Sequence, residues 1–192
     1  MAEKTNEGRN LIALLLEDHA KVKGLLEQVG DAAVDQESLF RRIVKDLATH
    51  EVAEEEVVYP AVRSWVKDGE ALADARVDEQ QQTEVLLASM ERMEPDTAEF
   101  RGSLEILRSA VLEHATHEEV EVFPALRRDV APERLATLAQ AYTVAKAMAP
   151  THPHPNAPNT FPGNVLVGPA FAIVDRAYDV VRSALQRASS SR

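Results

Sequence analysis

The sequence predicts an all-α protein, an up-down four-helix bundle made of two similar helical hairpins with additional C-terminal helices. Three observations favour this fold class. Alanine, leucine, valine and glutamate dominate the composition, and only seven of the 192 residues are glycine, which favours helix over sheet. Apolar residues recur at helical spacing along much of the chain. Two parts of the chain also repeat each other, and two copied hairpins can close into one bundle.

The first hairpin is expected to consist of helices over residues 10–28 and 36–66. Asn10 is a suitable N-cap for the first helix, and Gly30 is a suitable stop signal after it. Pro60 lies near the C-terminal end of the second helix. Because proline lacks a backbone N–H and its ring clashes with the preceding turn, we expect a kink there.

The second hairpin is expected to consist of a helix over residues 71–93 and another that ends near residue 128. A Pro-Asp dipeptide separates the two, and Pro124 should kink the second one near its end. A fifth helix is predicted over residues 131–149. It begins next to Pro132, and the first helical position is a favoured place for proline.

The C-terminal part of the chain differs in composition from the rest. Residues 150–169 contain six of the ten prolines, including the stretch "HPHP", and they cannot be helical throughout. We interpret them as a rigid linker rather than a metal clip, followed by a short amphipathic helix over residues 170–186. The predicted organisation is therefore a bundle over residues 1–149, with residues 150–192 forming a linker and a helix that packs on it.

Charge and cysteine content exclude several classes of function. The net charge of −11 disfavours nucleic acids and anionic membranes as partners. The chain has no cysteine, so disulfides, thiolate metal sites and cysteine nucleophiles are excluded, and any metal must be held by histidines and carboxylates. The early apolar run over residues 11–16 is too short to cross a membrane, and no cleavage site follows it. We therefore predict a cytoplasmic protein.

The repeat is clearest in two acidic stretches, "HEVAEEEVVYP" (residues 50–60) and "HATHEEVEVFP" (residues 114–124). Each contains a histidine followed four residues later by a glutamate, and residues at this spacing lie on one face of a helix. The surrounding apolar residues would turn that face toward the bundle interior, where imidazoles and carboxylates are costly unless they are paired or bind a metal. Such nitrogen and oxygen ligands suit iron, manganese or zinc, and bundle interiors can host two ions.

Together with a histidine in the first helix, this ordered pattern resembles the hemerythrin-like (HHE cation-binding) family over about residues 8–128. The His-Pro tail is similar to that of actinobacterial members. The resemblance implies two iron ions with an oxo or hydroxo bridge. Under it, His19 and His50 would bind one iron, His114 would bind the other, and Glu54 and Glu118 would bridge them.

The chain departs from the family pattern where a further histidine is expected, because that position holds Gln80. Several side chains are candidates to complete the second iron site. They are Gln80 itself through its amide oxygen, Glu79 or Glu84 on the same helix, His117 one turn from His114, and Glu51. The remaining glutamates of the repeat, Glu55, Glu56 and Glu119, are expected to face solvent, and Tyr59 is expected to pack or to support the ligands.

By resemblance, the chain would react with hydrogen peroxide, dioxygen or nitric oxide. We favour peroxide decomposition of catalase or peroxidase type, since an incomplete ligand set leaves an open coordination position. One alternative is a non-enzymatic protein that binds or senses oxygen or iron. Another is a bundle that holds one ion or none and acts through protein contacts. The terminal helix could mediate a homodimer.

Overall fold

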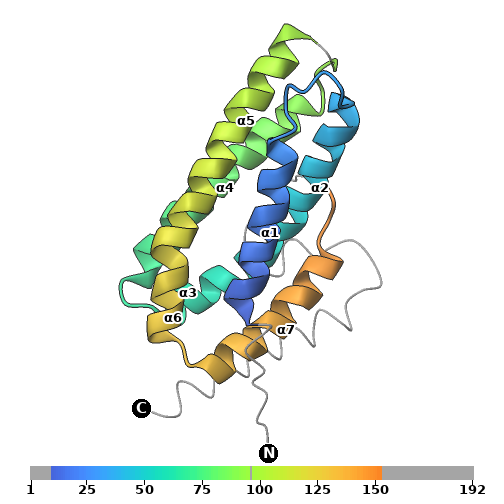
Figure 1. Cartoon of the computed structure of the whole chain (residues 1–192). Coiled ribbons are helices and arrows are strands. Elements are labelled where there is room, and N and C mark those ends of the chain that lie inside the picture. The colour runs from blue at the N-terminus through green and yellow to red at the C-terminus, as the bar shows by residue number, and fades with distance from the viewer. Residues whose placement is uncertain (1–9, 96, 153–192) are drawn as a thin grey trace, which may run out of the picture.

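The computed structural model describes residues 10–95 and 97–152, and within them every regular element is helical (Figure 1). This confirms the predicted all-α class. In chain order the elements are α1 (Leu11–Leu26), α2 (Gln36–Ala53), η2 (Glu54–Val58), α3 (Tyr59–Trp65), α4 (Gly69–Met90), α5 (Ala98–His117), η3 (Glu118–Val122), α6 (Phe123–Asp129) and α7 (Pro132–Met148). The elements η2 and η3 are single π-helical turns, each continuous with the α-helices on either side.

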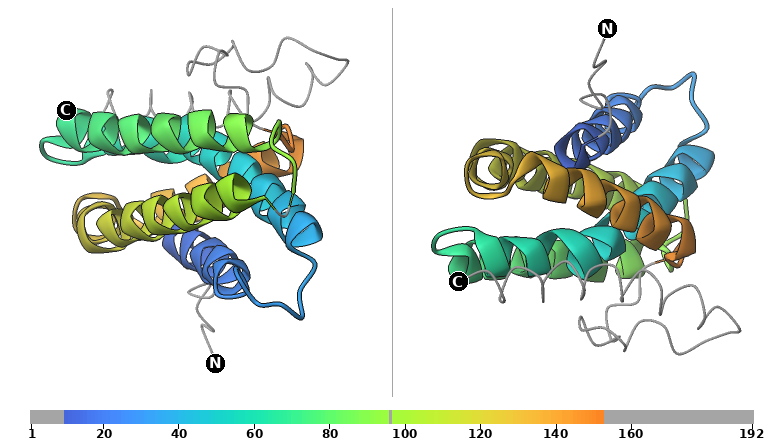
Figure 2. Two further views of the ribbon diagram at one scale, coloured as in Figure 1. Left: turned by 90° about the horizontal axis from the view of Figure 1, so that it is seen from above. Right: turned by 90° about the horizontal axis from the view of Figure 1, so that it is seen from below.

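The four long helices form two antiparallel hairpins that close around a common interior. α1 contacts α2 and α5, and α4 contacts α5 and α2, so each long helix has two neighbours (Figures 1 and 2). α7 packs against α1, α2 and η2 at the end of the bundle where α1 begins. Of the predicted linker and terminal helix, only residues 150–152 are described. That division of the chain therefore stays a prediction.

The local signals for helix ends act largely as expected. Asn10 caps α1, since its side chain accepts a hydrogen bond of 3.0 Å from the backbone N–H of Ala13. Gly30, with φ of 83°, occupies the turn after α1, where the left-handed backbone favours glycine. Two predicted ends were slightly too long, because α1 stops at Leu26 and α4 stops at Met90.

The predicted kinks at the prolines take the form of π-helical turns. The backbone N–H of Tyr59 bonds to the carbonyl of Glu54, and that of Phe123 bonds to the carbonyl of Glu118. Each π turn therefore begins at the glutamate of a His-x-x-x-Glu pair and ends just before a proline, which occupies the first turn of the following helix. The two copies of the repeat thus have the same backbone path.

Two hydrophobic clusters fill the interior, and the histidines lie in the layer between them. Leu15 belongs to the cluster that includes α3, α6 and α7, whereas Val22 belongs to the cluster at the other end of the bundle. His19 is located between these two residues on the same helix and is 4% exposed. The polar layer is therefore shielded from solvent by apolar packing on both sides.

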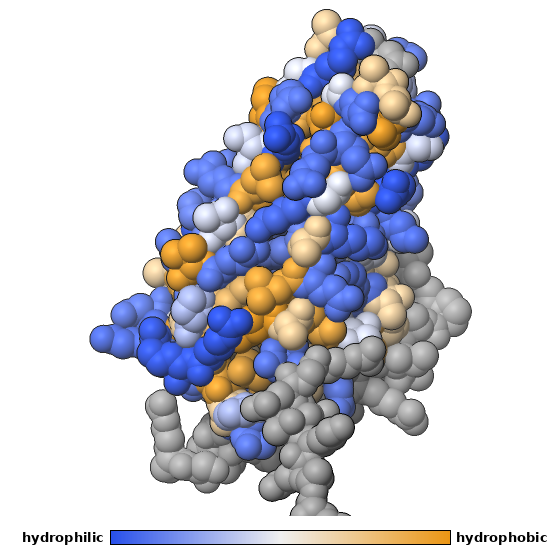
Figure 3. Space-filling view, viewed as in Figure 1, coloured by the Kyte–Doolittle hydropathy of each residue, from blue (hydrophilic) through white to orange (hydrophobic). Residues whose placement is uncertain are grey.

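The outer surface is mostly hydrophilic on the face seen in Figure 3, with hydrophobic side chains gathered mainly in its lower half. Among the described helices, none combines the length and apolar character needed to cross a membrane.

Candidate metal centre

Four buried side chains bring nitrogen and oxygen atoms together in the middle of the bundle. They are His19 of α1, His50 of α2, Glu54 of η2 and Glu118 of η3. Each offers one ligand atom, and these atoms all lie within 4.8 Å of one another. Both glutamates are fully buried. The cluster joins the two hairpins, because α1, α2 and η2 come from the first and η3 comes from the second.

His114 of α5 lies at the edge of this cluster. Its Nε2 is 3.5 Å from Oε2 of Glu118, and the equivalent pair in the first hairpin, His50 Nε2 and Glu54 Oε1, is 3.3 Å apart. His19 Nε2 also lies 3.2 Å from Glu118 Oε2. The four-residue spacing of the repeat therefore brings each histidine to its own glutamate, as the sequence predicts. All five principal candidates converge.

The outward-facing nitrogen of each of these three histidines has a hydrogen-bond partner. The pairs are His19 Nδ1 with Glu119 Oε1 (2.9 Å), His50 Nδ1 with the Tyr142 hydroxyl (2.7 Å), and His114 Nδ1 with Glu79 Oε2 (2.9 Å). In known metal sites, a ligating histidine uses one nitrogen for the metal and donates from the other to such an outer partner. Here each Nε2 is left facing the glutamates.

Several polar atoms that face the centre lack hydrogen-bond partners. Among the described residues, the buried side-chain atoms without a partner are His19 Nε2, Glu54 Oε1, Gln80 Oε1, His114 Nε2, Glu118 Oε2 and Arg76 Nε. Five of the six belong to the centre. Each buried polar atom without a hydrogen-bond partner costs about 1–3 kcal/mol, so a ligand that contacts these atoms would stabilise the folded protein. A cation held by imidazole nitrogens and carboxylate oxygens would satisfy them, and this donor set suits iron, manganese or zinc.

The two central glutamates have opposite pKa shifts. Burial raises the pKa of Glu54 well above its usual range, and the nearby charge of Glu118 raises it further. Burial would also raise the pKa of Glu118, but the close approach of His19, whose Nε2 lies 3.2 Å from Oε2, and the charges of His114 and His19 outweigh burial and lower it to about 2. A divalent cation would stabilise both carboxylates in the ionised form.

The imidazoles respond to the same environment. Burial lowers the pKa of His19, but the close approach and charge of Glu118 outweigh it, and the net effect raises that pKa. Burial dominates at His50 and lowers its pKa. The cluster thus holds one ion-paired and one more neutral imidazole. Metal binding would displace a proton from the former, since a ligating histidine must be neutral.

Gln80, at the position where a further histidine was expected, reaches the centre. Its Nε2 donates a hydrogen bond of 2.7 Å to Glu54 Oε2, and its side chain is 2% exposed. Its Oε1 is among the partnerless atoms. Gln80 therefore contributes an amide to the centre, where an imidazole would have contributed a stronger nitrogen ligand.

The other candidates lie around the centre rather than in it. Glu79 accepts hydrogen bonds from His114 Nδ1 and from His117 Nδ1, both of 2.9 Å, and also from Arg76. His117 therefore faces Glu79. Glu51 is buried, and burial followed by the charge of Glu84 raises its pKa well above the usual range. None of these side chains belongs to the four-residue cluster.

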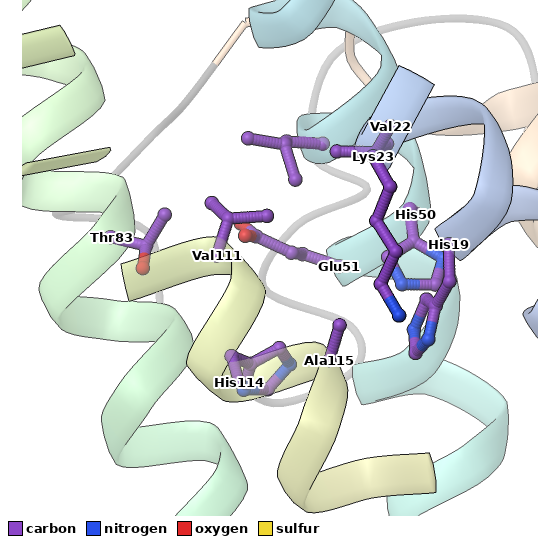
Figure 4. Close-up of a pocket in the computed structure, with 10 residues that line it drawn as sticks. His19, Val22, Lys23, His50, Glu51, Thr83, Val111, His114 and Ala115 are labelled. Atoms are coloured by element: carbon purple, nitrogen blue, oxygen red, sulfur yellow. The ribbon is translucent and has the colours of Figure 1, made fainter. Parts of the chain in front are cut away.

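A cavity of about 20 Å³ adjoins the centre. Figure 4 shows His19 and His50 on one side of it and His114 on the other, with Glu51 between them. The lining residues are His19, Val22, Lys23, Leu47, His50, Glu51, Thr83, Val111, His114 and Ala115. A volume of about 10–15 Å³ already holds a water molecule, so the cavity admits molecules of one or two heavy atoms.

Several contacts to the centre were not predicted from the sequence. Glu119 was expected to face solvent, but it accepts a hydrogen bond from His19 and another from Lys23. Tyr59 was expected to pack or to support the ligands, and it is buried and donates a hydrogen bond of 2.9 Å to Glu118. Only the identity of its partner was not predicted, because the equivalent residue of the repeat is a phenylalanine. Tyr142 comes from α7, which has no repeated counterpart.

Comparison with known proteins agrees with this centre. The family model described as the hemerythrin HHE cation binding domain matches residues 10–126. The chain is 34% identical over 141 residues, 72% of its length, to a protein named DNA nickase from Nostoc sp. (strain PCC 7120), and it spans 39% of that longer relative. It is 28% identical over 171 residues to an uncharacterized hemerythrin-like protein of Schizosaccharomyces pombe, covering 87% of this chain and 84% of the relative. No solved structure gives a significant match. Since the family model covers more than half of the chain, including all five converging side chains, the chain belongs to the hemerythrin HHE cation-binding domain family.

Proposed function

We propose that this chain is a non-haem di-iron protein that reacts with a small oxidant, hydrogen peroxide in the first place and dioxygen or nitric oxide as the other candidates. One observation carries the proposal. Three buried histidines are each tethered at Nδ1, two by carboxylates and one by a tyrosine hydroxyl, and the Nε2 atoms face two buried glutamates. This is the arrangement of metal-ligating histidines with their outer partners.

In this proposal His19 and His50 would hold one iron, His114 would hold the other, and Glu54 and Glu118 would supply carboxylate oxygens to them. Bound iron would supply the redox chemistry. The chain's own residues hold the ions and keep bulk water out, because apolar clusters pack on both sides of the polar layer. Tyr59 and Gln80 orient the two glutamates by donating a hydrogen bond to each.

The preference for peroxide chemistry rests on Gln80 and on the cavity. An amide is a weaker ligand than an imidazole, so the second iron would keep an open or exchangeable position, and open positions favour reaction over purely structural binding. The adjoining cavity of about 20 Å³ has room for molecules as small as peroxide, dioxygen and nitric oxide.

A second candidate is a centre that holds a single ion. The four clustered side chains, His19, His50, Glu54 and Glu118, form a set for one cation without His114. We do not extend the nickase name of the Nostoc relative to this chain. That relative is much longer, and the net charge of −11 opposes binding to a DNA backbone.

Metal content per chain, measured after expression in iron-replete medium, tests the proposal together with peroxide consumption. We expect two irons per chain, and we expect Glu54→Gln to lose at least half of them. Glu56→Gln is the matched control, because Glu56 lies two residues away and outside the cluster. A single ion would favour the one-ion centre, and none would favour an interaction bundle. Two irons without peroxide consumption would favour a binding or sensing protein.

A further inference from the structure

α7 lies beyond residues 10–126, which match the family model, yet it packs directly on the half of the bundle that holds the centre. It contacts α1, α2 and η2, and Figure 2 shows it crossing the end of the bundle. Its buried face belongs to the same hydrophobic cluster as Tyr59 and Phe123, with Leu135, Leu138, Ala139, Ala141, Tyr142 and Ala145 as its members. The helix is therefore part of the core that surrounds the histidines.

Tyr142 is the residue of α7 that reaches the centre. Its side chain is 1% exposed, and its hydroxyl lies 2.7 Å from His50 Nδ1 and 2.7 Å from Asp18 Oδ2. Asp18 is also paired with Lys146, one turn further along α7. A continuous series of contacts thus runs from the surface of α7 to a proposed metal ligand.

The hydrogen bonds fix the tautomer of His50. A tyrosine hydroxyl has one hydrogen, and here it is donated to the carboxylate of Asp18, which as an ion can only accept. The same hydroxyl must therefore accept its second hydrogen bond, so Nδ1 of His50 carries the hydrogen. Nε2 is then left as the lone-pair nitrogen, which is the form that a metal ligand requires.

The other two histidines receive this support from carboxylates within the matched domain. Glu119 serves His19, and Glu79 serves His114. For His50 the carboxylate on the Nδ1 side, that of Asp18, is 3.7 Å from Nδ1, which is too far for a direct hydrogen bond. Tyr142 bridges that gap.

We infer that α7 is a functional part of the metal centre, with Tyr142 as the positioning residue that holds His50 in its ligating tautomer and Asp18 and Lys146 holding Tyr142 in place. The inference rests on the proposed role of His50 as a ligand. It extends the centre beyond the residues that match the family model.

The test compares Tyr142→Phe with Thr143→Val. Each substitution removes one hydroxyl from α7, and the Thr143 hydroxyl bonds only within the helix, to the carbonyl of Ala139. We would measure affinity for cobalt(II), as a spectroscopic probe, and the His50 tautomer of the metal-free protein by long-range ¹H–¹⁵N NMR. Tyr142→Phe should weaken cobalt binding about 10–100-fold and abolish the preference for Nδ1–H, as is typical when an outer partner is lost. Thr143→Val should have the cobalt affinity of the wild type and the same His50 tautomer.

Equal affinities and tautomers in the two variants would overturn the inference while leaving the proposed function intact. A wild-type protein that binds no metal would overturn both. If Tyr142→Phe fails to fold, Lys146→Met gives a second test at the partly exposed outer end of the series. Lys146→Met should also weaken cobalt binding, by a smaller factor than Tyr142→Phe does. A cobalt affinity equal to that of Thr143→Val would contradict the inference.

Discussion

Gln80 makes the two halves of the centre unequal. The repeat supplies each hairpin with one histidine and one glutamate. The other helix of each hairpin contributes a third residue, which is His19 of α1 in the first hairpin and Gln80 of α4 in the second. Gln80 donates a hydrogen bond to Glu54 and leaves its own Oε1 without a partner. The amide therefore stabilises a ligand and adds little binding strength of its own.

An imidazole at position 80 should strengthen metal binding in the half of the centre that now contains Gln80. We expect Gln80→His to raise the affinity for the second ion by at least about tenfold, since histidine nitrogen is a better ligand than an amide for iron. Stepwise titration of the metal-free protein with iron(II) under anaerobic conditions would measure this. Gln80→Leu is the control, because it removes the hydrogen bond to Glu54 without adding a ligand. A second ion bound no more tightly in Gln80→His than in the wild type would contradict our view of Gln80.

At the scale of single residues, the sequence predicted the inner face of the centre and missed much of its outer support. His50 and Glu54, like their repeated counterparts, are four residues apart, so helical geometry alone predicts that they meet. Tyr142 lies 92 residues from His50, and no local period connects them. Glu119 was missed for a different reason, because a charged residue beside a predicted ligand has the composition of a solvated face.

At the scale of helices, the number and approximate limits of the helices followed from apolar spacing and helix stop signals. The π turns could not be predicted from these signals. A proline at position 60 or 124 removes one backbone donor, and both a kinked α-helix and a π turn accommodate that loss. The choice between them depends on the packing of Glu54 and Glu118 inside the bundle, which the sequence of one helix does not contain.

The turn between α3 and α4 allows a sharp prediction. A Cβ at Gly69 would overlap the backbone carbonyl of Val62, whereas a Cβ at Gly102 of α5 would meet nothing within 4 Å. Gly102→Ala should therefore stabilise the protein by about 0.5–1 kcal/mol, the usual gain for alanine over glycine inside a helix. Gly69→Ala should destabilise it by more than about 1 kcal/mol.

Urea unfolding of the two variants beside the wild type measures both effects. The two substitutions are chemically identical and both lie in helices, so helix propensity cannot produce opposite signs. Equal gains in the free energy of unfolding would show that α3 and α4 do not approach as closely at Gly69 as the structure indicates.

At the scale of the whole molecule, the centre joins the two hairpins. The buried carboxylates Glu54 and Glu118 come from different hairpins, and the charge of Glu118 raises the cost of ionising Glu54 unless a cation lies between them. Metal should therefore stabilise the folded chain beyond its effect on either hairpin alone. Its removal should loosen the contact between the hairpins.

We expect iron(II) at about 100 times its dissociation constant to stabilise the fold by about 2.7 kcal/mol, which corresponds to a rise in Tm of roughly 5–10 °C for a chain of this size. Calorimetry before and after treatment with a chelator would measure the change. The Glu54→Gln variant should show a smaller rise, because it is expected to lose at least half of its bound iron. A wild-type Tm that is the same with and without metal would mean that the centre does not couple metal binding to folding.

The paired π turns also have a consequence for how chains of this kind can change in length. A π turn holds one more residue than the α-helical turn it replaces, and each residue of an α-helix turns the chain by about 100°. Deleting a single residue within η2 would restore an unbroken α-helix with little rotation of Tyr59, because the π turn already absorbs that extra residue. Deleting one from the α-helical stretch between His50 and Glu54 would instead turn Glu54 by about 100° relative to His50. Both copies of the repeat keep the same count from histidine to proline. Side chains of this interval that face away from the centre can therefore be exchanged, but a change of length between His50 and Glu54 would separate two residues of the centre.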